Sequence, residues 1–475
     1  MGLLALCRRI SVAYDFLVSV EYFMNTNKVL LCAVVVVLGC GFVAGQTQYN
    51  LLWSFGSPND GASPLSDLVL DGTGNLYGTT RLGGTTPFCT FCGTVFKLSP
   101  NSDGTWTETI LYNFCSLVGN SICLDGQWPE AGLIFDAKGN LFGTTSAGGT
   151  QPCPIGGCGT VFELSPPSSS GGQWVETVLY TFCANQSNAC PDGMEPSGRL
   201  VMDASGNLYG TTPMGGSGHS VDTGGGGIVF ELSQGAGGWT ESVLYNFCTL
   251  GQNRVCPDGA GPQAGVTFDK TGNLYGTTKF GGGNQPTGSG TVFRLSPGQN
   301  GWTETVLKAG DGNLGINPLG TVSIDPFGNL YSTASAQGPK MEGTAFRLRP
   351  GGGGTVFAFN GVNGAAPSAG VLIDTKHPAL YGTTFQGGAG FGSVFKIVAP
   401  AEETVLYNFC SQPNCTDGSG PVASLIEDKA GNLYGTTKLG GANNQGVVFE
   451  IVQSLPKRKG SQHPPAWHTI LAAKK

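Results

Sequence analysis

The stretch Gly74-Asn75-Leu76-Tyr77-Gly78-Thr79-Thr80 decides the fold of this chain because it recurs along the whole sequence. Repetition at intervals of several tens of residues is typical of solenoids and propellers, in which each repeat is one supersecondary unit. The 475 residues are therefore expected to form one repeat array rather than several unrelated domains. The seven copies, or close relatives, have their aromatic residues 50 to 67 positions apart, at Tyr77, Phe142, Tyr209, Tyr275, Tyr331, Tyr381 and Tyr434.

Each copy lies within a longer unit of four apolar segments. In the second unit, a segment ending at Asp136 precedes the repeated stretch, and Gly159–Leu164 and Trp174–Phe182 follow it. These segments are short, rich in β-branched and aromatic residues and bounded by Gly, Asp, Asn or Pro, which is typical of strands. The first two are joined by Asp-x-x-Gly-Asn, a turn sequence because Asp accepts amide hydrogens and Gly adopts positive φ. Four up-and-down strands, repeated radially, predict a β-propeller blade.

The two ends of the array complement each other. The last unit stops after its third segment, Val447–Val452, whereas Tyr49–Phe55 matches a fourth segment. We therefore predict an all-β fold, a seven-bladed β-propeller with four antiparallel strands per blade, closed by the N-terminal strand joining the last blade. Such closure removes the exposed strand edges that an open array would leave. One domain is expected over residues 46–455, with blades at about 63–115, 129–183, 196–248, 262–308, 318–360, 367–410 and 421–452 plus 48–56.

Composition agrees with many short strands joined by tight turns. Gly accounts for 79 of the 475 residues, and charged residues for only 12%. The net charge of -7 supplies no basic stripe for nucleic acid, so nucleic-acid binding is not expected.

Residues 1–45 are predicted to be an export signal. Lys28 is followed by the apolar run Val29–Val43 and then by small residues, which describes a secretory signal peptide. The run is short for a membrane span, so none is expected in the mature chain. Met24 begins an ordinary signal sequence and is an alternative start. A second alternative is lipidation at Cys40, because Val-Leu-Gly-Cys resembles a bacterial lipoprotein box. The protein is expected to be secreted or at the cell surface.

Twelve of the fifteen cysteines form six local pairs. An even, strictly paired set in an exported chain predicts disulfides. The alternative is that Cys89-Thr-Phe-Cys92 forms half of a zinc site or a redox pair, but no His lies near it. The predicted disulfides are Cys89–Cys92, Cys115–Cys123, Cys153–Cys158, Cys183–Cys190, Cys248–Cys256 and Cys410–Cys415.

All six pairs fall in two classes of loop. These are the loops after the second strand and the loops after the fourth strand, and in an up-and-down blade both emerge on the same face of the ring. We call this the disulfide face. Function tends to reside on loops held by a rigid scaffold, so the binding site is expected there.

The repeat unit resembles known tandem-repeat families. The cadence Pro-x-x-Gly-Leu-x-x-Asp-x-x-Gly-Asn-Leu-Tyr-Gly-Thr-Thr is similar to that of NHL-type propeller repeats. With Gly-Thr-Val-Phe and Thr-Glu-Thr-Val-Leu-Tyr-x-Phe added, it resembles the GloVer tandem repeats of bacterial choice-of-anchor proteins. The resemblance covers about Tyr49 to Val452 and implies a bacterial exported protein, without an agreed activity. Residues 456–475 depart from it: they are basic, contain no apolar anchor helix and are expected to be a disordered tail.

Few residues are candidates for chemistry. His219 lies near Asp222 in a Gly-rich loop, but a metal or catalytic site would need more converging ligands. No catalytic residue, metal or cofactor is predicted. The Asp-Gly pairs that precede the first strands suit turns, and a shared role on the disulfide face is the alternative; they lie at Asp125, Asp192, Asp258, Asp311 and Asp417.

Trp128 occurs once in the repeats, in a polar loop on the disulfide face, where it suits stacking on a sugar ring; packing on the adjacent blade is the alternative. The predicted function is that of a monomeric, non-catalytic extracellular binding or scaffold protein engaging a glycan or a cell-surface protein. Its candidate binding residues are Trp128, Glu130, Glu195, His219 and Asp222. The alternative is a polysaccharide hydrolase or lyase using Glu130, Glu195 and Asp222 at the channel mouth, which would require paired carboxylates.

Overall fold

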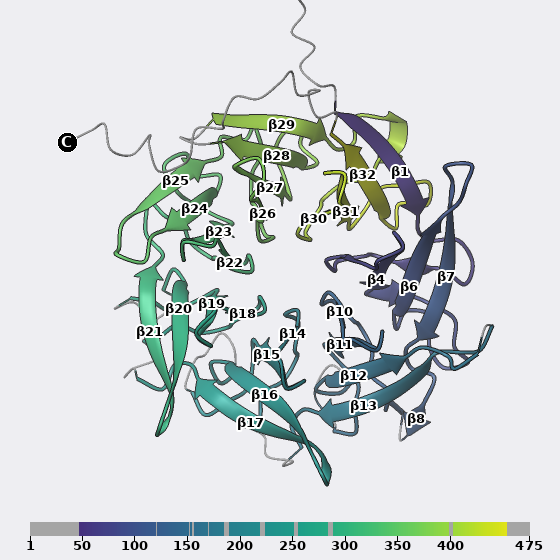
Figure 1. The fold of residues 1–475 in the computed structure, drawn as a ribbon, viewed down its shortest axis with the longest axis horizontal. Helices are drawn as coiled ribbons and strands as arrows, with labels where there is room; N and C mark the ends of the chain where they lie inside the picture. The colour runs from purple at the N-terminus through teal and green to yellow at the C-terminus, as the bar shows by residue number, and fades with distance from the viewer. Residues whose placement is uncertain are drawn as a thin grey trace, which may run out of the picture. The chain divides into compact units, whose positions relative to one another are not determined.

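The computed structural model describes residues 47–453 except 120, 152, 154–155, 170, 185–189, 219–223, 251–254, 284–287 and 399–401. The chain divides into two units, Met1–Ala44 and Gly45–Lys475, and every described residue belongs to the second. In that unit, seven four-stranded antiparallel sheets form a seven-bladed β-propeller, which confirms the predicted fold (Figure 1). The short first strands lie nearest the centre of the ring, and the fourth strands lie at its rim.

Blades 1 to 4 follow one another along the chain. Blade 1 has β3 (Val69–Leu70), β4 (Leu76–Thr80), β6 (Thr94–Pro100) and β7 (Trp106–Asn113). Blade 2 has β10 (Ile134–Phe135), β11 (Leu141–Thr145), β12 (Thr160–Ser165) and β13 (Val175–Thr181). Blade 3 has β14 (Val201–Met202), β15 (Leu208–Thr212), β16 (Ile228–Gly235) and β17 (Gly238–Asn246). Blade 4 has β18 (Thr267–Phe268), β19 (Leu274–Thr278), β20 (Thr291–Gly298) and β21 (Gly301–Ala309).

The remaining blades complete the ring. Blade 5 has β22 (Ser323–Ile324), β23 (Leu330–Ala334), β24 (Thr344–Leu348) and β25 (Gly354–Ala358). Blade 6 has β26 (Leu372–Asp374), β27 (Ala379–Thr384), β28 (Ser393–Val398) and β29 (Glu402–Asn408). Blade 7 has β30 (Ile426–Glu427), β31 (Leu433–Thr437), β32 (Val447–Val452) and β1 (Gln48–Ser54). Loop elements are β2 (Gly61–Ala62) paired with β5 (Leu82–Gly83), β8 (Val118–Gly119) paired with β9 (Ile122–Cys123), and the 3-10 turn η1 (Pro413–Cys415).

The ring is closed by strand β1. It pairs antiparallel with β32, from Gln48 opposite Val452 to Ser54 opposite Val447. The first described strand of the chain is therefore the fourth strand of the last blade, as predicted. The first and last strands of the repeat array therefore form hydrogen bonds with each other.

The second and third strands form the buried centre of each blade. In blade 1 every residue of β4 is buried. A Cβ added to Gly78 would approach the ring of Phe96 in β6 to 2.7 Å, so the Gly of the repeated Leu-Tyr-Gly-Thr-Thr makes room for the third-strand Phe. Blade 5 departs from this pattern with Ser332, whose hydroxyl donates to the carbonyl of Gly320 at 2.8 Å.

The predicted turn chemistry is present between the first and second strands. Asp71 Oδ1 accepts hydrogen bonds from the backbone N–H groups of Thr73 at 2.8 Å and Asn75 at 3.0 Å. Burial alone would raise the pKa of Asp71, but the hydrogen bonds from Asn75 and Thr73 outweigh it and lower the pKa to about 2. The carboxylate is thus a structural acceptor.

Phenylalanine side chains join neighbouring blades. The Phe that follows a fourth strand packs against the third-strand Phe of the next blade, as in Phe114 and Phe162, whose ring centroids lie 5.1 Å apart. Such contacts contribute about 0.5–1.5 kcal/mol beyond their buried area. The pair recurs at five further junctions, at 5.0 or 5.1 Å: Phe55–Phe96, Phe182–Phe230, Phe247–Phe293, Phe359–Phe395 and Phe409–Phe449.

The two loop classes of the disulfide face meet through backbone hydrogen bonds. In blade 2, Gln127 before the first strand is bridged to Ala147 after the second strand. The same bridge recurs in each of the seven blades, with β2 and β5 forming it in blade 1. The loops after the second and fourth strands therefore lie on one face, as the up-and-down topology predicted.

Candidate functional site

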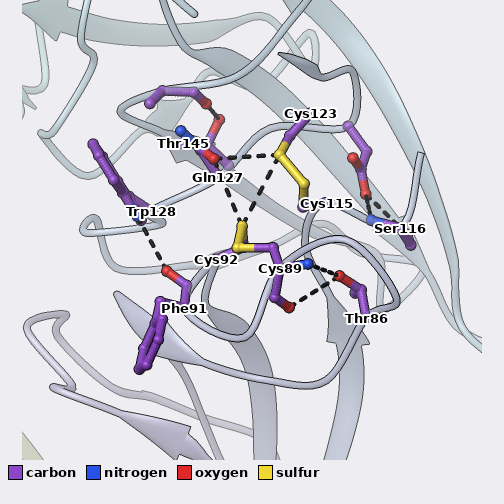
Figure 2. Close-up of a disulfide and its surroundings, with 12 residues drawn as sticks. Thr86, Cys89, Phe91, Cys92, Cys115, Ser116, Cys123, Gln127, Trp128 and Thr145 are labelled. Carbon is purple, nitrogen blue, oxygen red and sulfur yellow. Dashed lines mark hydrogen bonds between the residues drawn. A yellow bond between two sulfur atoms is a disulfide. The ribbon is translucent and has the colours of Figure 1, made fainter. Parts of the chain in front are cut away.

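The six predicted cysteine pairs are disulfides. Two of them come together between blades 1 and 2, where Cys92 Sγ lies 4.0 Å from Cys123 Sγ (Figure 2). Each such cluster ties the loop after a second strand to the loop that leads into the next blade. A second cluster of the same kind lies between blades 2 and 3, where four Sγ atoms fall within 4.8 Å of one another: Cys153, Cys158, Cys183 and Cys190.

Trp128 spans the junction of blades 1 and 2. Its indole N–H donates to the carbonyl of Phe91 at 3.1 Å, and its backbone N–H donates to the carbonyl of Cys92 at 2.9 Å (Figure 2). The Arg81 guanidinium lies 5.1 Å from the centre of its ring, within cation–π range. Trp128 therefore contacts the adjacent blade and also remains partly exposed.

The loop held by Trp128 carries two exposed rings that the sequence analysis did not select. Phe88 and Phe91 are each 66% exposed and flank Cys89 in the loop closed by the Cys89–Cys92 disulfide. Thr86 fixes the same loop, since its hydroxyl donates to the carbonyl of Cys89 and accepts from its N–H. The available signal was two aromatic residues outside the strand positions of the repeat, in a polar loop.

The two predicted glutamates lie near each other. Glu130 accepts a hydrogen bond from Arg81 Nε at 2.5 Å in an ion pair. Burial raises the pKa of Glu195, and the negative charge of Glu130 raises it further. Glu195 occupies the position of Trp128 one blade later, because its N–H donates to the carbonyl of Cys158 at 2.9 Å. The structure therefore brings Trp128, Glu130 and Arg81 together, with Glu195 close by.

A small cavity of about 110 Å³, open to solvent, lies at the centre of the ring, with Asp67, Glu130 and Arg199 among its lining residues. Asp67 accepts a hydrogen bond from the N–H of Ser424 at 2.6 Å. Burial raises the pKa of Asp67, and the Arg199 charge partly opposes that rise. Asp67 and Arg199 each stand at the Gly position of the repeated Pro-x-x-Gly, where the other repeats have a small residue. An alignment of the repeats would have revealed these two substitutions, which were not predicted.

Some predicted positions lie outside the described residues. His219 and Asp222 belong to the gap at 219–223, and Cys40, the export signal and the basic tail belong to the undescribed terminal segments. Among the predicted binding residues, the structure thus places Trp128, Glu130 and Glu195. No helix in the described part of the chain has the length and apolar character needed to cross a membrane.

Exposed apolar side chains are concentrated on the disulfide face. Of the thirteen large apolar side chains exposed among the described residues, eight belong to loops of this face. Contiguous exposed apolar surface is a mark of interaction sites, whereas single exposed residues are ordinary. Phe88 and Phe91 are the two that share one loop, and the other six are Leu117, Leu250, Met341, Val362, Phe391 and Leu439.

The fold and its loops define a disulfide-bonded β-propeller built from tandem repeats. The chain belongs to the Gloeobacter/Verrucomicrobia repeat family, whose profile matches residues 41–220 and 282–458. This confirms the resemblance that the repeat motifs indicated. The repeat family and the propeller fold fit an extracellular protein. No curated protein matches the chain.

Several solved structures are similar to this chain. The polysaccharide lyase Uly1 is 10% identical with a TM-score of 0.48, over 84% of this chain and 92% of that chain. A PL25 ulvan lyase is 11% identical with a TM-score of 0.48, over 85% and 96% of the two chains. A putative 6-phosphogluconolactonase from Bacteroides uniformis is 14% identical with a TM-score of 0.44, over 74% and 85%. At this level of identity, the likeness concerns the fold alone.

Proposed function

We propose that the protein is a non-catalytic extracellular binding protein, secreted or held at the cell surface, that presents its disulfide face to a glycan. The observation that carries the proposal is the exposure of Phe88 and Phe91, each 66% exposed on a loop closed by Cys89–Cys92. An aromatic face is a suitable platform for the apolar face of a sugar ring, and its burial on binding is favourable.

The rings stand on a loop that is already ordered. The disulfide closes the loop, the Trp128 indole holds the Phe91 carbonyl, and Thr86 holds the backbone of Cys89. A binding loop that is fixed before the ligand arrives loses little conformational entropy on binding, so more of the contact energy appears as affinity.

Polar groups lie beside the rings. The Arg81–Glu130 ion pair adjoins Trp128, which contacts the Phe91 loop, and offers both donors and an acceptor. Sugar hydroxyls require such mixed partners. The combination of exposed rings and a nearby donor–acceptor pair therefore favours a neutral or weakly charged glycan over a purely apolar ligand.

The test is a glycan array followed by titration of the best ligand with the purified protein. We expect Phe88→Ala and Phe91→Ala together to weaken binding at least about tenfold, since each truncation removes a stacking surface. Phe327→Ala is the matched control, because Phe327 is 61% exposed in a first-to-second-strand turn on the opposite face. Absence of any glycan ligand, or equal binding by the double variant, contradicts the proposal; binding of a surface protein instead would assign the face to that partner.

A polysaccharide hydrolase or lyase is the second candidate. It is favoured by the raised pKa of Glu195, which burial and the Glu130 charge both produce, because a catalytic acid requires a raised pKa. Incubation with neutral and acidic polysaccharides, with chain cleavage as the readout, tests it. Cleavage that is lost in Glu195→Gln supports an enzyme, and intact polysaccharide in all cases removes this candidate.

A further inference from the structure

The outer part of every blade junction brings one loop residue toward one strand residue. The loop residue lies two positions before the loop residue that forms the backbone bridge, and the strand residue is the one opposite the third-strand Leu or Ile in the next blade. At the junction of blades 5 and 6 these residues are Asn363 and Glu403. The Asn363 side-chain amide donates to Glu403 Oε2 at 3.1 Å. The two positions are therefore within hydrogen-bonding distance.

Four other junctions have Asp in place of this Asn and keep the opposing Glu. The four Asp are nearly fully buried, with exposures of 7%, 0%, 4% and 1% for Asp60, Asp125, Asp192 and Asp258. The opposing Glu is the one in the repeated Trp-x-Glu of the fourth strand. The pairs are Asp60 with Glu108, Asp125 with Glu176, Asp192 with Glu241, and Asp258 with Glu304.

In each of these pairs, one oxygen of each carboxyl group has no hydrogen-bond partner among the described residues. Asp125 Oδ2 accepts hydrogen bonds from the Tyr112 hydroxyl and the Ser116 N–H, both at 2.8 Å. Asp125 Oδ1 and Glu176 Oε1 are buried and have no such partner within the described part of the chain. The same holds for one oxygen of every member of the other three pairs. A buried carboxyl oxygen without a donor is costly. Glu403 Oε1 also lacks a partner although Asn363 donates to Glu403 Oε2, so the deficit particular to the acid pairs is the one on the Asp.

We infer that each of these four Asp–Glu pairs holds a single shared proton, so that the stability of the blade junctions depends on pH. A protonated Glu donates to the leftover oxygen of its Asp, and this O–H···O contact takes the place of the Asn363–Glu403 amide contact. One proton thereby satisfies the leftover Asp oxygen and removes one of two buried like charges.

The neighbouring groups favour a proton. Burial, and then the interaction with Asp60, raises the pKa of Glu108. Burial, and then the charge of the paired Asp, raises the pKa of Glu176 and Glu241 to about 8 and of Glu304 to about 7. Among the described residues, the other titratable groups facing the acids are Tyr112, Tyr180 and Tyr245, whose hydroxyls donate to Asp Oδ2 and supply no positive charge.

The remaining junctions supply a donor or lack the acids. At the junction of blades 6 and 7, Tyr49 takes the Glu position and its hydroxyl donates to the Asp417 carbonyl at 2.7 Å. At the junction of blades 4 and 5, Leu314 and Gly354 take the two positions. The Asp311-Gly312 pair, expected to match the other Asp-Gly pairs, is displaced from this position, and Asp311 instead binds Lys308 at 2.6 Å.

The direction of the pH effect follows from linkage. An unfolded Glu titrates near pH 4.5, whereas the folded pKa of the paired Glu lies well above it. Between these values the folded protein binds more protons than the unfolded chain, so stability falls as pH rises. The stabilising contribution is complete below about pH 4.5 and is lost as pH passes through about 7 to 8.

The test compares thermal unfolding of the full chain from about pH 5 to about pH 9 with that of a variant carrying Asp60→Asn, Asp125→Asn, Asp192→Asn and Asp258→Asn. At positions 125, 192 and 258 the Asn can accept from the same Tyr, and at all four positions it can donate to the Glu, as Asn363 does. We expect the Tm of the native protein to fall over this range and the profile of the variant to be flatter. Asn363→Asp should add a fifth pair and steepen the fall, and Asp311→Asn is the matched control with no change in slope.

Infrared spectroscopy gives an independent readout. The native protein at neutral pH should show the C=O stretch of protonated carboxyl groups, and this band should be weaker in the Asp→Asn variant. A flat native profile, or a native spectrum without that band, overturns the inference. A rise in Tm with added Ca²⁺ that EDTA reverses, without the protonated band, assigns the pairs to a cation and also overturns it.

Discussion

The junction of blades 1 and 2 has three side-chain contacts that the junction of blades 4 and 5 lacks. The first junction has the rings of Phe114 and Phe162, the Cys115–Cys123 disulfide and the Asp125–Glu176 pair. At the second junction the corresponding sequence contains no cysteine, and small or apolar residues take the other positions: Gly310, Leu314 and Gly354.

Both junctions nevertheless keep the same backbone contacts. The N–H of Phe114 donates to Gly93 at 3.1 Å, and the N–H of Gly310 donates to Gly290 at 2.8 Å. The bridge of Gln127 with Ala147 has its counterpart in Ile316 with Ala336. The geometry of the ring therefore comes from backbone hydrogen bonds, and the side chains determine how strongly each junction is held.

The largest expected effect is the loss of a junction ring. Phe114→Ala removes a side chain that is 1% exposed, and truncation of a buried Phe costs about 3–5 kcal/mol. The urea midpoint of unfolding measures it. Leu307→Ala, in the outer strand before the weaker junction, is the control and should cost little because Leu307 is 37% exposed. Equal losses for the two variants would mean that the ring pair does not distinguish the junctions.

An intermediate effect is expected from the disulfide. Replacing Cys115 and Cys123 by Ser opens a loop with a sequence separation of 8, and the chain-entropy estimate for its closure is about 2–3 kcal/mol. Hydrogen exchange should increase around this loop and remain unchanged at residues 310–316. Increased exchange at both places would show that the junctions are coupled through the ring.

The smallest expected effect is the loss of a turn carboxylate, and it should be the same in blade 1 and in blade 4. Asp71 in blade 1 and Asp269 in blade 4 accept the same turn hydrogen bonds, and both have a pKa of about 2 despite the opposing effect of burial. Because these folded values are lowered, their stabilisation is present at neutral pH and is lost as pH falls from about 4 to about 2. For such exposed groups it amounts to less than about 1 kcal/mol.

Asp71→Asn and Asp269→Asn, compared by thermal unfolding at neutral and acid pH, measure this contribution. The two variants should lose the same stability at pH 7 and converge with the native protein near about pH 2. A larger loss for one of them would show that the turn is not an independent part of the repeat.

The candidate site was only partly predictable. Trp128 was identified because it breaks the repeat, and Glu130 as a carboxylate expected at the channel mouth. Phe88 and Phe91 were missed because aromatic residues usually signal a strand, and only the structure shows that their loop leaves them exposed. Asp67 and Arg199 were missed because the small-residue position they replace could not be assigned to the channel from one unit alone.

The sequence by itself determined the blades, their number, the closing strand and the disulfide partners. These depend on patterns within about one repeat: strand periodicity, turn residues and cysteines a few residues apart. The tertiary structure alone decided which residue of one repeat meets which residue of the next. The Asp-Gly and Trp-x-Glu motifs were both visible in the sequence. Because both motifs recur in several repeats, the sequence does not show which copy of one packs against which copy of the other. The packing of adjacent blades selected Asp125 and Glu176 as partners, and burial there makes a shared proton more stable than two separate charges.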